Sequence, residues 1–106
     1  MRKLLILALA SFSVQAFAAG DADSGKLKSQ ACAACHGPDG NSPTGPDFPR
    51  LAGQRYDYLL KALRDYKSGA RKNPIMGAQV GSLNPQDMAD LAAFYSRQKG
   101  SLHVLR

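Results

Sequence analysis

Several features that define common classes of protein are missing from this chain of 106 residues. It has only two cysteines, so a structural zinc site, which needs about four ligands, would have to be completed by histidine. Its lysines and arginines form no dense run, which argues against nucleic acid as a partner. The chain also lacks strand periodicity, internal repeats and low-complexity tracts. A single all-α domain is therefore predicted.

The two cysteines stand in the stretch Cys32-Ala33-Ala34-Cys35-His36, and this spacing predicts a covalent haem attachment site. Two intervening residues on a helical turn let both thiols reach the cofactor, so that each can add to one haem vinyl group. The imidazole of the histidine that follows can then become an axial ligand of the iron.

Three other kinds of site could use the same motif. A thioredoxin-like redox pair also uses Cys-x-x-Cys, but it requires a βαβ context that this sequence does not show. A zinc site could add only His103, on the C-terminal tail, to Cys32, Cys35 and His36. An inert disulfide would leave His36 without a role.

The N-terminus has the layout of a secretory signal peptide, predicted over residues 1–18. Arg2 and Lys3 give the positive start, and an apolar core too short to span a bilayer comfortably leads to the small-x-small site Ala16-Phe17-Ala18. The alternative is an uncleaved anchor. Cleavage after Ala18 would export a soluble domain over 19–106, and its net charge would fall from +6 to +4. Scattered lysines and arginines usually form a solvated surface; the alternative is a basic face that steers docking onto acidic partners.

Three amphipathic helices are expected, over about 22–36, 54–66 and 85–98. Asp21 should cap the first, Gly69 should end the second, and Asn84-Pro85 should open the third. The Pro- and Gly-rich segment 37–50 and the segment 71–82, with Asn73-Pro74 as a breaker, are expected to be loops. A long loop in so small a domain needs something to wrap around, and haem is the candidate.

A haem iron held by His36 needs an occupant for its other axial position, and Met76 is the predicted ligand. Its thioether would suit electron transfer, and the loop around it, with Gly77 next in sequence, would let the sulfur approach the haem face. Met88 falls on the apolar stripe of the last helix and is expected in the core. His103 is the weaker alternative ligand.

Five blocks of sequence then carry a resemblance to a known family. In order, they are Cys32-Ala33-Ala34-Cys35-His36-Gly37, Asp39-Gly40-Asn41, Pro49-Arg50-Leu51-Ala52-Gly53-Gln54, Asn73-Pro74-Ile75-Met76 and Asp90-Leu91-Ala92-Ala93-Phe94-Tyr95. The chain resembles class I c-type cytochromes. It is most similar to small bacterial cytochromes of the c-553 type and to single halves of dihaem cytochrome c4 proteins. The resemblance covers essentially all of 20–98, and the single motif implies one haem.

The resemblance implies a small cytochrome c fold, with about three main helices and irregular loops around one covalent haem c. Cys32 and Cys35 would carry the thioether bonds, His36 the proximal iron bond and Met76 the distal one. The first and last helices would cross, which would place Gly25 against Leu91 or Tyr95.

The resemblance also implies contacts around the haem. A proline carbonyl in the loop after the motif would accept a hydrogen bond from His36, with Pro46 as the candidate and Pro43 as its rival. Arg50 and Gln54 would reach the haem propionates.

These observations together predict a periplasmic, monohaem electron carrier that is not an enzyme. Expected partners are redox proteins, such as a terminal oxidase, a respiratory complex or a periplasmic dehydrogenase, met through a small and brief interface. The carrier is expected to be a monomer or a weak dimer without stable membrane insertion. The alternatives are a haem subunit of a larger enzyme, and a ligand-binding or sensing haem protein with a labile distal site.

Overall fold

The computed structural model describes residues 19–100. The predicted signal peptide and His103 lie outside these residues. Five helices account for most of the described chain, and no strand occurs within it. The helices are α1 (Ala22–Lys28), α2 (Gln30–His36), α3 (Tyr56–Ser68), α4 (Pro74–Val80) and α5 (Pro85–Ser96). The all-α prediction is confirmed. Between 19 and 100, no helix is both long enough and apolar enough to cross a membrane.

The first predicted helix is divided in two at Ser29. Asp21 caps α1 as predicted, and its side chain accepts hydrogen bonds from the backbone N–H groups of Asp23 and Ser24. At the other end, both the hydroxyl and the backbone N–H of Ser29 donate to the carbonyl of Lys26. A serine that binds a nearby carbonyl competes with the regular helical ladder, and the chain starts a second helix at the next residue.

The segment 71–82 contains a helix, α4, where the sequence predicts a loop. Asn73 is the N-cap rather than a breaker, because its side chain accepts hydrogen bonds from the N–H groups of Ile75 and Met76. Pro74 occupies the first helical turn, where its missing N–H costs nothing. The prediction of three main helices was therefore too low, by this helix and by the division at Ser29.

Helix α5 forms the centre of the core. Its residues from Met88 to Tyr95 are all buried, and Leu91 is only 1% exposed. A capping box between Asn84 and Asp87 fixes its start, so the Asn84-Pro85 prediction is confirmed. Met88 is a core residue, as expected.

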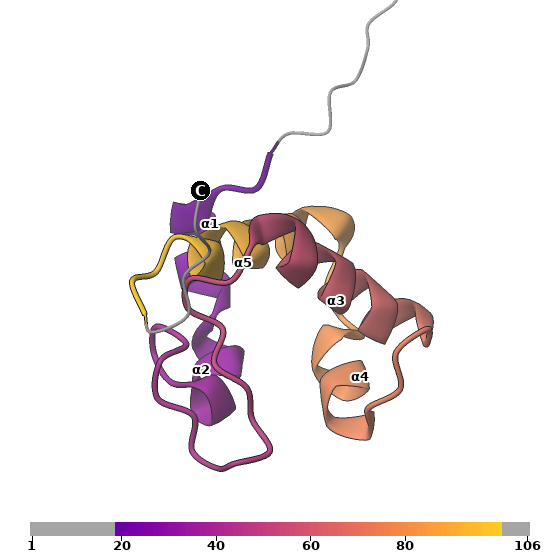
Figure 1. Cartoon of the computed structure of the whole chain (residues 1–106). Coiled ribbons are helices and arrows are strands. Elements are labelled where there is room, and N and C mark those ends of the chain that lie inside the picture. The colour runs from indigo at the N-terminus through magenta and orange to yellow at the C-terminus, as the bar shows by residue number, and fades with distance from the viewer. Residues whose placement is uncertain (1–18, 101–106) are drawn as a thin grey trace, which may run out of the picture.

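The first and last helices cross, as the resemblance implied, and α1 packs closely on α5 (Figure 1). A β-carbon at Gly25 would lie 2.0 Å from the carbonyl oxygen of Asp90 and 2.8 Å from the Cβ of Phe94. The contacts of Gly25 are thus Asp90 and Phe94, each one position before the residues that were predicted. Only glycine permits this approach of the two backbones.

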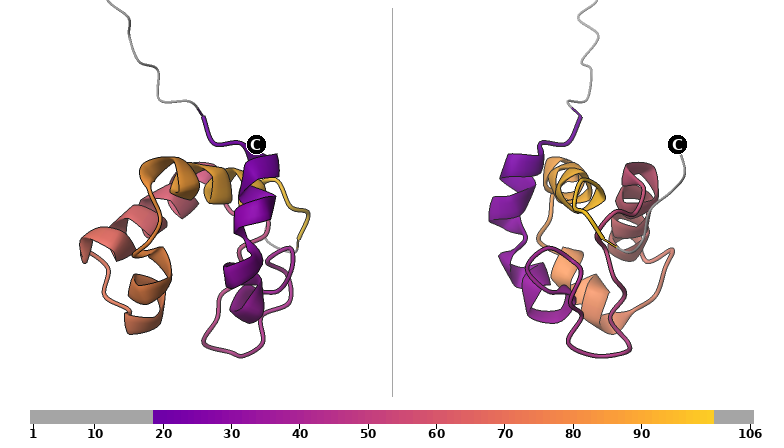
Figure 2. Two further views of the ribbon diagram at one scale, coloured as in Figure 1. Left: turned by 180° about the vertical axis from the view of Figure 1, so that it is seen from behind. Right: turned by 60° about the vertical axis from the view of Figure 1, so that its left-hand side comes forward.

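Helix α3 packs on α5 through Leu59 and Leu60 and ends at Gly69, which has the left-handed conformation expected of a C-cap. Helix α4 packs against α3. Seen from several sides, α2 and the loop 37–50 form one arm of the molecule and α3 and α4 form the other, with the crossing of α1 and α5 joining them (Figures 1 and 2).

Candidate haem site

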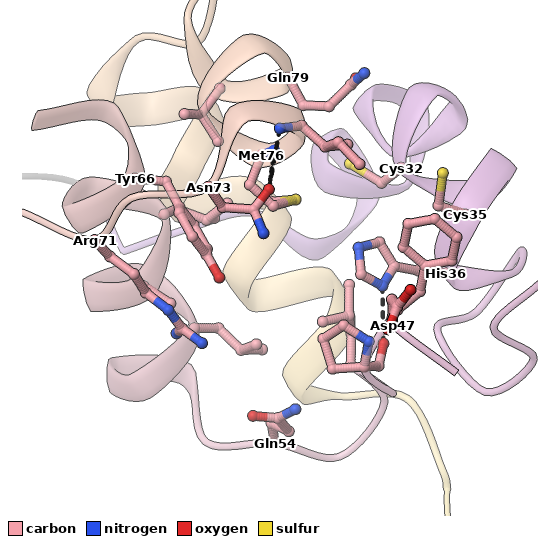
Figure 3. Close-up of a pocket in the computed structure, with 18 of the residues that line it drawn as sticks. Cys32, Cys35, His36, Asp47, Gln54, Tyr66, Arg71, Asn73, Met76 and Gln79 are labelled. Carbon is pink, nitrogen blue, oxygen red and sulfur yellow. Dashed lines mark hydrogen bonds between the residues drawn. The ribbon is translucent and has the colours of Figure 1, made fainter. Parts of the chain in front are cut away.

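A cavity of about 470 Å³ lies between the two arms. Cys32, Cys35 and His36 reach it from α2, and Met76 reaches it from α4 (Figure 3). The rest of its wall is largely apolar and includes Phe48, Leu59, Leu63, Val80 and Leu83. The fold therefore brings together the four residues that the sequence predicted as covalent and axial attachments.

His36, the last residue of α2, is held in a fixed orientation. Its side chain is buried, and its Nδ1 lies 2.8 Å from the carbonyl oxygen of Pro49. Because a carbonyl can only accept, Nδ1 must donate, which leaves Nε2 with the lone pair that a metal requires. The ring of Phe48 packs edge-on against the imidazole, with 6.2 Å between the ring centroids.

The prediction that Pro46 accepts this hydrogen bond is wrong, and so is its rival, Pro43. A proline carbonyl does bind His36, but it belongs to Pro49, thirteen residues after the histidine. Pro46 is exposed and lines the cavity. The path of the loop brings Pro49 back to the end of α2 because Leu51 and Ala52 both donate hydrogen bonds to the carbonyl of Gly40.

Both cysteines are free thiols and half-buried at the cavity wall. Burial raises the pKa of the Cys32 thiol, and the nearby Tyr95 hydroxyl partly opposes this effect. Within residues 19–100, no group of three or more histidine, cysteine or acidic side chains is arranged to hold a metal ion. The zinc interpretation thus finds no ligand set in the described chain.

Met76 lies in the first turns of α4, half-buried, and its backbone N–H is bound 3.1 Å from Oδ1 of Asn73. Figure 3 shows its sulfur and the ring of His36 on opposite sides of the cavity, facing one another. The residue is therefore positioned by a short capped helix and not by the flexible loop that the sequence predicted.

Arg71 was not predicted as a site residue, and within residues 19–100 it is the one lysine or arginine that lines the cavity. Its guanidinium lies over the ring of Tyr66, 4.8 Å from the ring centre. A hydrogen bond with Tyr58 raises the pKa of Arg71. Gln54 also lines the cavity, and Figure 3 shows Arg71 and Gln54 on the side away from the cysteines. Arg50 is exposed, and its contact with the cofactor stays a prediction.

The residues of the cavity fit a covalently attached haem. The volume falls in the range of about 300–1,000 Å³ that is usual for cofactor sites. Two free thiols at one wall can form the thioether bonds, and a buried imidazole has one ring nitrogen free for iron. A cation stands on the opposite side, where the carboxylates of a haem attached at its vinyl edge would lie.

Comparisons with known proteins place the chain in one family. A family model described as cytochrome c matches residues 22–97. Cytochrome c4 of Pseudomonas aeruginosa is 47% identical over 104 residues, which cover 96% of this chain and 51% of that protein. Cytochrome c-554(548) of Halomonas halodenitrificans is 40% identical over 84 residues, which cover 76% of this chain and 100% of that protein.

A solved structure shows the same fold. Reduced recombinant cytochrome c4 from Pseudomonas stutzeri matches with a TM-score of 0.73 and 46% identity, over 79% of this chain and 48% of that chain. The chain spans about half the length of the cytochrome c4 proteins that it matches. From the family model, the relatives and the shared fold, the chain belongs to the cytochrome c family, and its Cys32–Cys35 pair implies covalently bound haem c.

Proposed function

We propose that this protein is a carrier of single electrons whose haem iron is bound by His36 and Met76. The observation that carries the proposal is the placement of these two side chains on opposite sides of one cavity whose wall also holds Cys32 and Cys35. Bound haem supplies an iron that takes up and releases one electron. With both axial positions filled by the protein, no substrate reaches the iron, so the protein is not an enzyme by itself.

The other residues of the site have supporting roles in this proposal. The Pro49 carbonyl holds His36 with Nε2 toward the iron. Phe48 and the leucines of the wall exclude water, which favours the less charged, reduced state of the iron. Arg71 would neutralise the haem propionates, and Gln54, on the same side of the cavity, would donate hydrogen bonds to them.

The expected location is the periplasm, reached through the predicted signal peptide over residues 1–18 with the mature domain beginning at 19. The partners would be other redox proteins, such as a terminal oxidase, a respiratory complex or a periplasmic dehydrogenase. The docking faces of these partners are expected to be acidic, because the excess of basic over acidic residues in this chain is concentrated in one segment. In 19–100 the basic residues outnumber the acids by three, yet the segment 61–72 alone has five basic residues and one acid.

An absorption spectrum of the matured holoprotein and two variants tests the proposal. The oxidised wild type should show the weak long-wavelength charge-transfer band of methionine-ligated iron, and the reduced form should show sharp α and β bands. Met76→Ala should remove the long-wavelength band. Met88→Leu should retain it, because Met88 is buried in the core and does not line the cavity.

Two results would contradict the proposal in different ways. A wild-type haem spectrum without the methionine band would favour the ligand-binding or sensing alternative, in which the distal site is open. Retention of the band in Met76→Ala would show that another residue binds the iron. Purification as a stable complex with a larger enzyme would establish the alternative of a haem subunit.

A further inference from the structure

Helix α4, which carries Met76, has little else to hold it in place. It packs against α3, and most of its residues are exposed, including Ile75 at 55%. A β-carbon at Gly77 would meet no atom within 4 Å. The segment that leads into the helix, 69–73, is exposed throughout. The position of the helix must therefore depend on a few specific contacts.

Two of these contacts are made by residues at the two ends of α4, Asn73 and Val80. The Asn73 cap fixes the geometry of the first turn, but it is local and does not tie the helix to the rest of the protein. Val80, at the last position, is 1% exposed and anchors the helix by burial.

The third contact is a bridge from α3. The ammonium group of Lys67 donates to the carbonyl oxygens of Gly81, at 3.4 Å, and of Leu83. Both carbonyls belong to the turn that leaves α4, in which the N–H of Leu83 binds the carbonyl of Val80. These carbonyls lie at and just beyond the C-cap of α4, where a cation interacts favourably with the negative end of the helix dipole. Lys67 is thus well suited to hold this end of α4 against α3.

We propose that Lys67 is a positioning residue for the distal iron ligand, acting as a latch on the C-terminal end of α4. Movement of this end changes the position of Met76, because the two are separated by little more than one helical turn. A thioether is a soft ligand and a poor match for ferric iron, so its bond depends on close placement. The inference rests on the proposed function, since it requires Met76 to bind the iron.

Binding of imidazole to the ferric holoprotein provides the test, because imidazole competes with the methionine sulfur for the iron. Lys67→Met keeps the apolar stem but removes the three N–H donors. The variant should bind imidazole on the order of three- to tenfold more tightly, the range expected for loss of charged hydrogen bonds that are partly exposed. Its methionine band should also disappear at a lower temperature.

Two further variants separate a latch from a general effect of charge. Lys61→Met removes the same charge from the same helix, where the lysine is 75% exposed and pairs with Asp65, and its imidazole affinity should stay within about twofold of wild type. Lys67→Arg retains a cation with donors and should restore most of the wild-type behaviour.

The latch is overturned if Lys67→Met binds imidazole like the wild type, or if Lys61→Met tightens binding equally. If the proposed function itself is wrong, a different measurement shows it. In that case the wild type itself would lack the methionine band before any lysine is changed.

Discussion

The side chain of Lys28 reaches from α1 to the buried carboxylate of Asp90 on α5, with 2.6 Å between Nζ and Oδ2. Asp90 is 2% exposed and also accepts hydrogen bonds from the backbone N–H of Asp21 and the side chain of Gln86. The carboxylate thus joins both ends of α1 to α5 at the helix crossing. Burial alone would raise the pKa of Asp90, but these hydrogen bonds outweigh it and lower the pKa.

The first prediction follows from that lowered pKa. A carboxylate with a depressed folded-state pKa contributes stability that is complete above its unfolded pKa of about 4 and is lost as the pH falls through its folded pKa. Asp90→Asn should therefore lower the unfolding free energy at pH 7 by about 2–4 kcal/mol and flatten its decline in acid. Urea denaturation of the holoprotein between neutral and acidic pH measures both effects.

Asp23→Asn is the matched control, because Asp23 is an exposed acid on α1, and it should change stability by no more than about 0.5 kcal/mol. Equal losses in the two variants would show that Asp90 has no special role in joining the helices.

The second prediction concerns the close approach of α1 and α5. Gly25→Ala should destabilise the protein by about 1–3 kcal/mol or more, because its methyl group would lie 2.0 Å from the Asp90 carbonyl oxygen and force the helices apart. Gly81→Ala is the control. Its β-carbon would meet atoms no closer than 3.5 Å and its φ is −56°, so thermal denaturation should show little loss of stability. A Gly25→Ala midpoint equal to that of Gly81→Ala would disprove the tight crossing.

The sequence alone was sufficient to predict the Cys-x-x-Cys-His motif and α5, because each depends on local chemistry, whereas the helix crossing was expected only from the family resemblance. Asn84-Pro85 was correctly interpreted as the start of a helix. Asn73-Pro74 has the same sequence pattern and also caps a helix, with Asn73 accepting from two backbone N–H groups, but the pair is predicted from the sequence to be a breaker. The nearby Gly77 and Gly81 weakened the helical signal there, although an N-cap followed by proline was enough to identify α4.

The contacts of the long loop could not be predicted in the same way. Which proline carbonyl meets His36 depends on hydrogen bonds from Leu51 and Ala52 to Gly40, and these join parts of the loop more than ten residues apart. Likewise, Arg71 reaches the cavity because α3 and α4 fold back on each other, and its sequence position between two helices gave no sign of this.

The third prediction compares the effects of Arg71 and Arg50 on the reduction potential of the haem. Arg71→Gln should lower the reduction potential, because loss of a positive charge at the cavity stabilises the ferric state. A shift on the order of 20–50 mV corresponds to one partly solvated charge. Arg50→Gln, the matched substitution at the other candidate, should shift the potential by less than half as much. Spectroelectrochemical titration measures both, and a larger shift in Arg50→Gln would favour Arg50 as the propionate partner instead.

The fourth prediction concerns the concentration of basic residues in 61–72. This segment forms the second half of α3 and the loop before α4, on the opposite side of the molecule from α1 (Figures 1 and 2). Lys72→Gln should slow oxidation of the reduced protein by hexacyanoferrate(III), an anionic probe, by about two- to threefold at low salt. Lys26→Gln removes an exposed lysine from α1 and should have a smaller effect.

Ionic strength completes this test, because exposed charges are screened over about 10 Å in 0.1 M salt. In stopped-flow measurements the rates of wild type, Lys72→Gln and Lys26→Gln should converge as salt is added. A cationic cobalt complex should show the opposite order at low salt, with Lys72→Gln reacting faster than the wild type. If both lysine variants instead slow the anionic probe equally, the effect comes from net charge alone. That result would contradict the proposal that partners dock an acidic face against the segment 61–72.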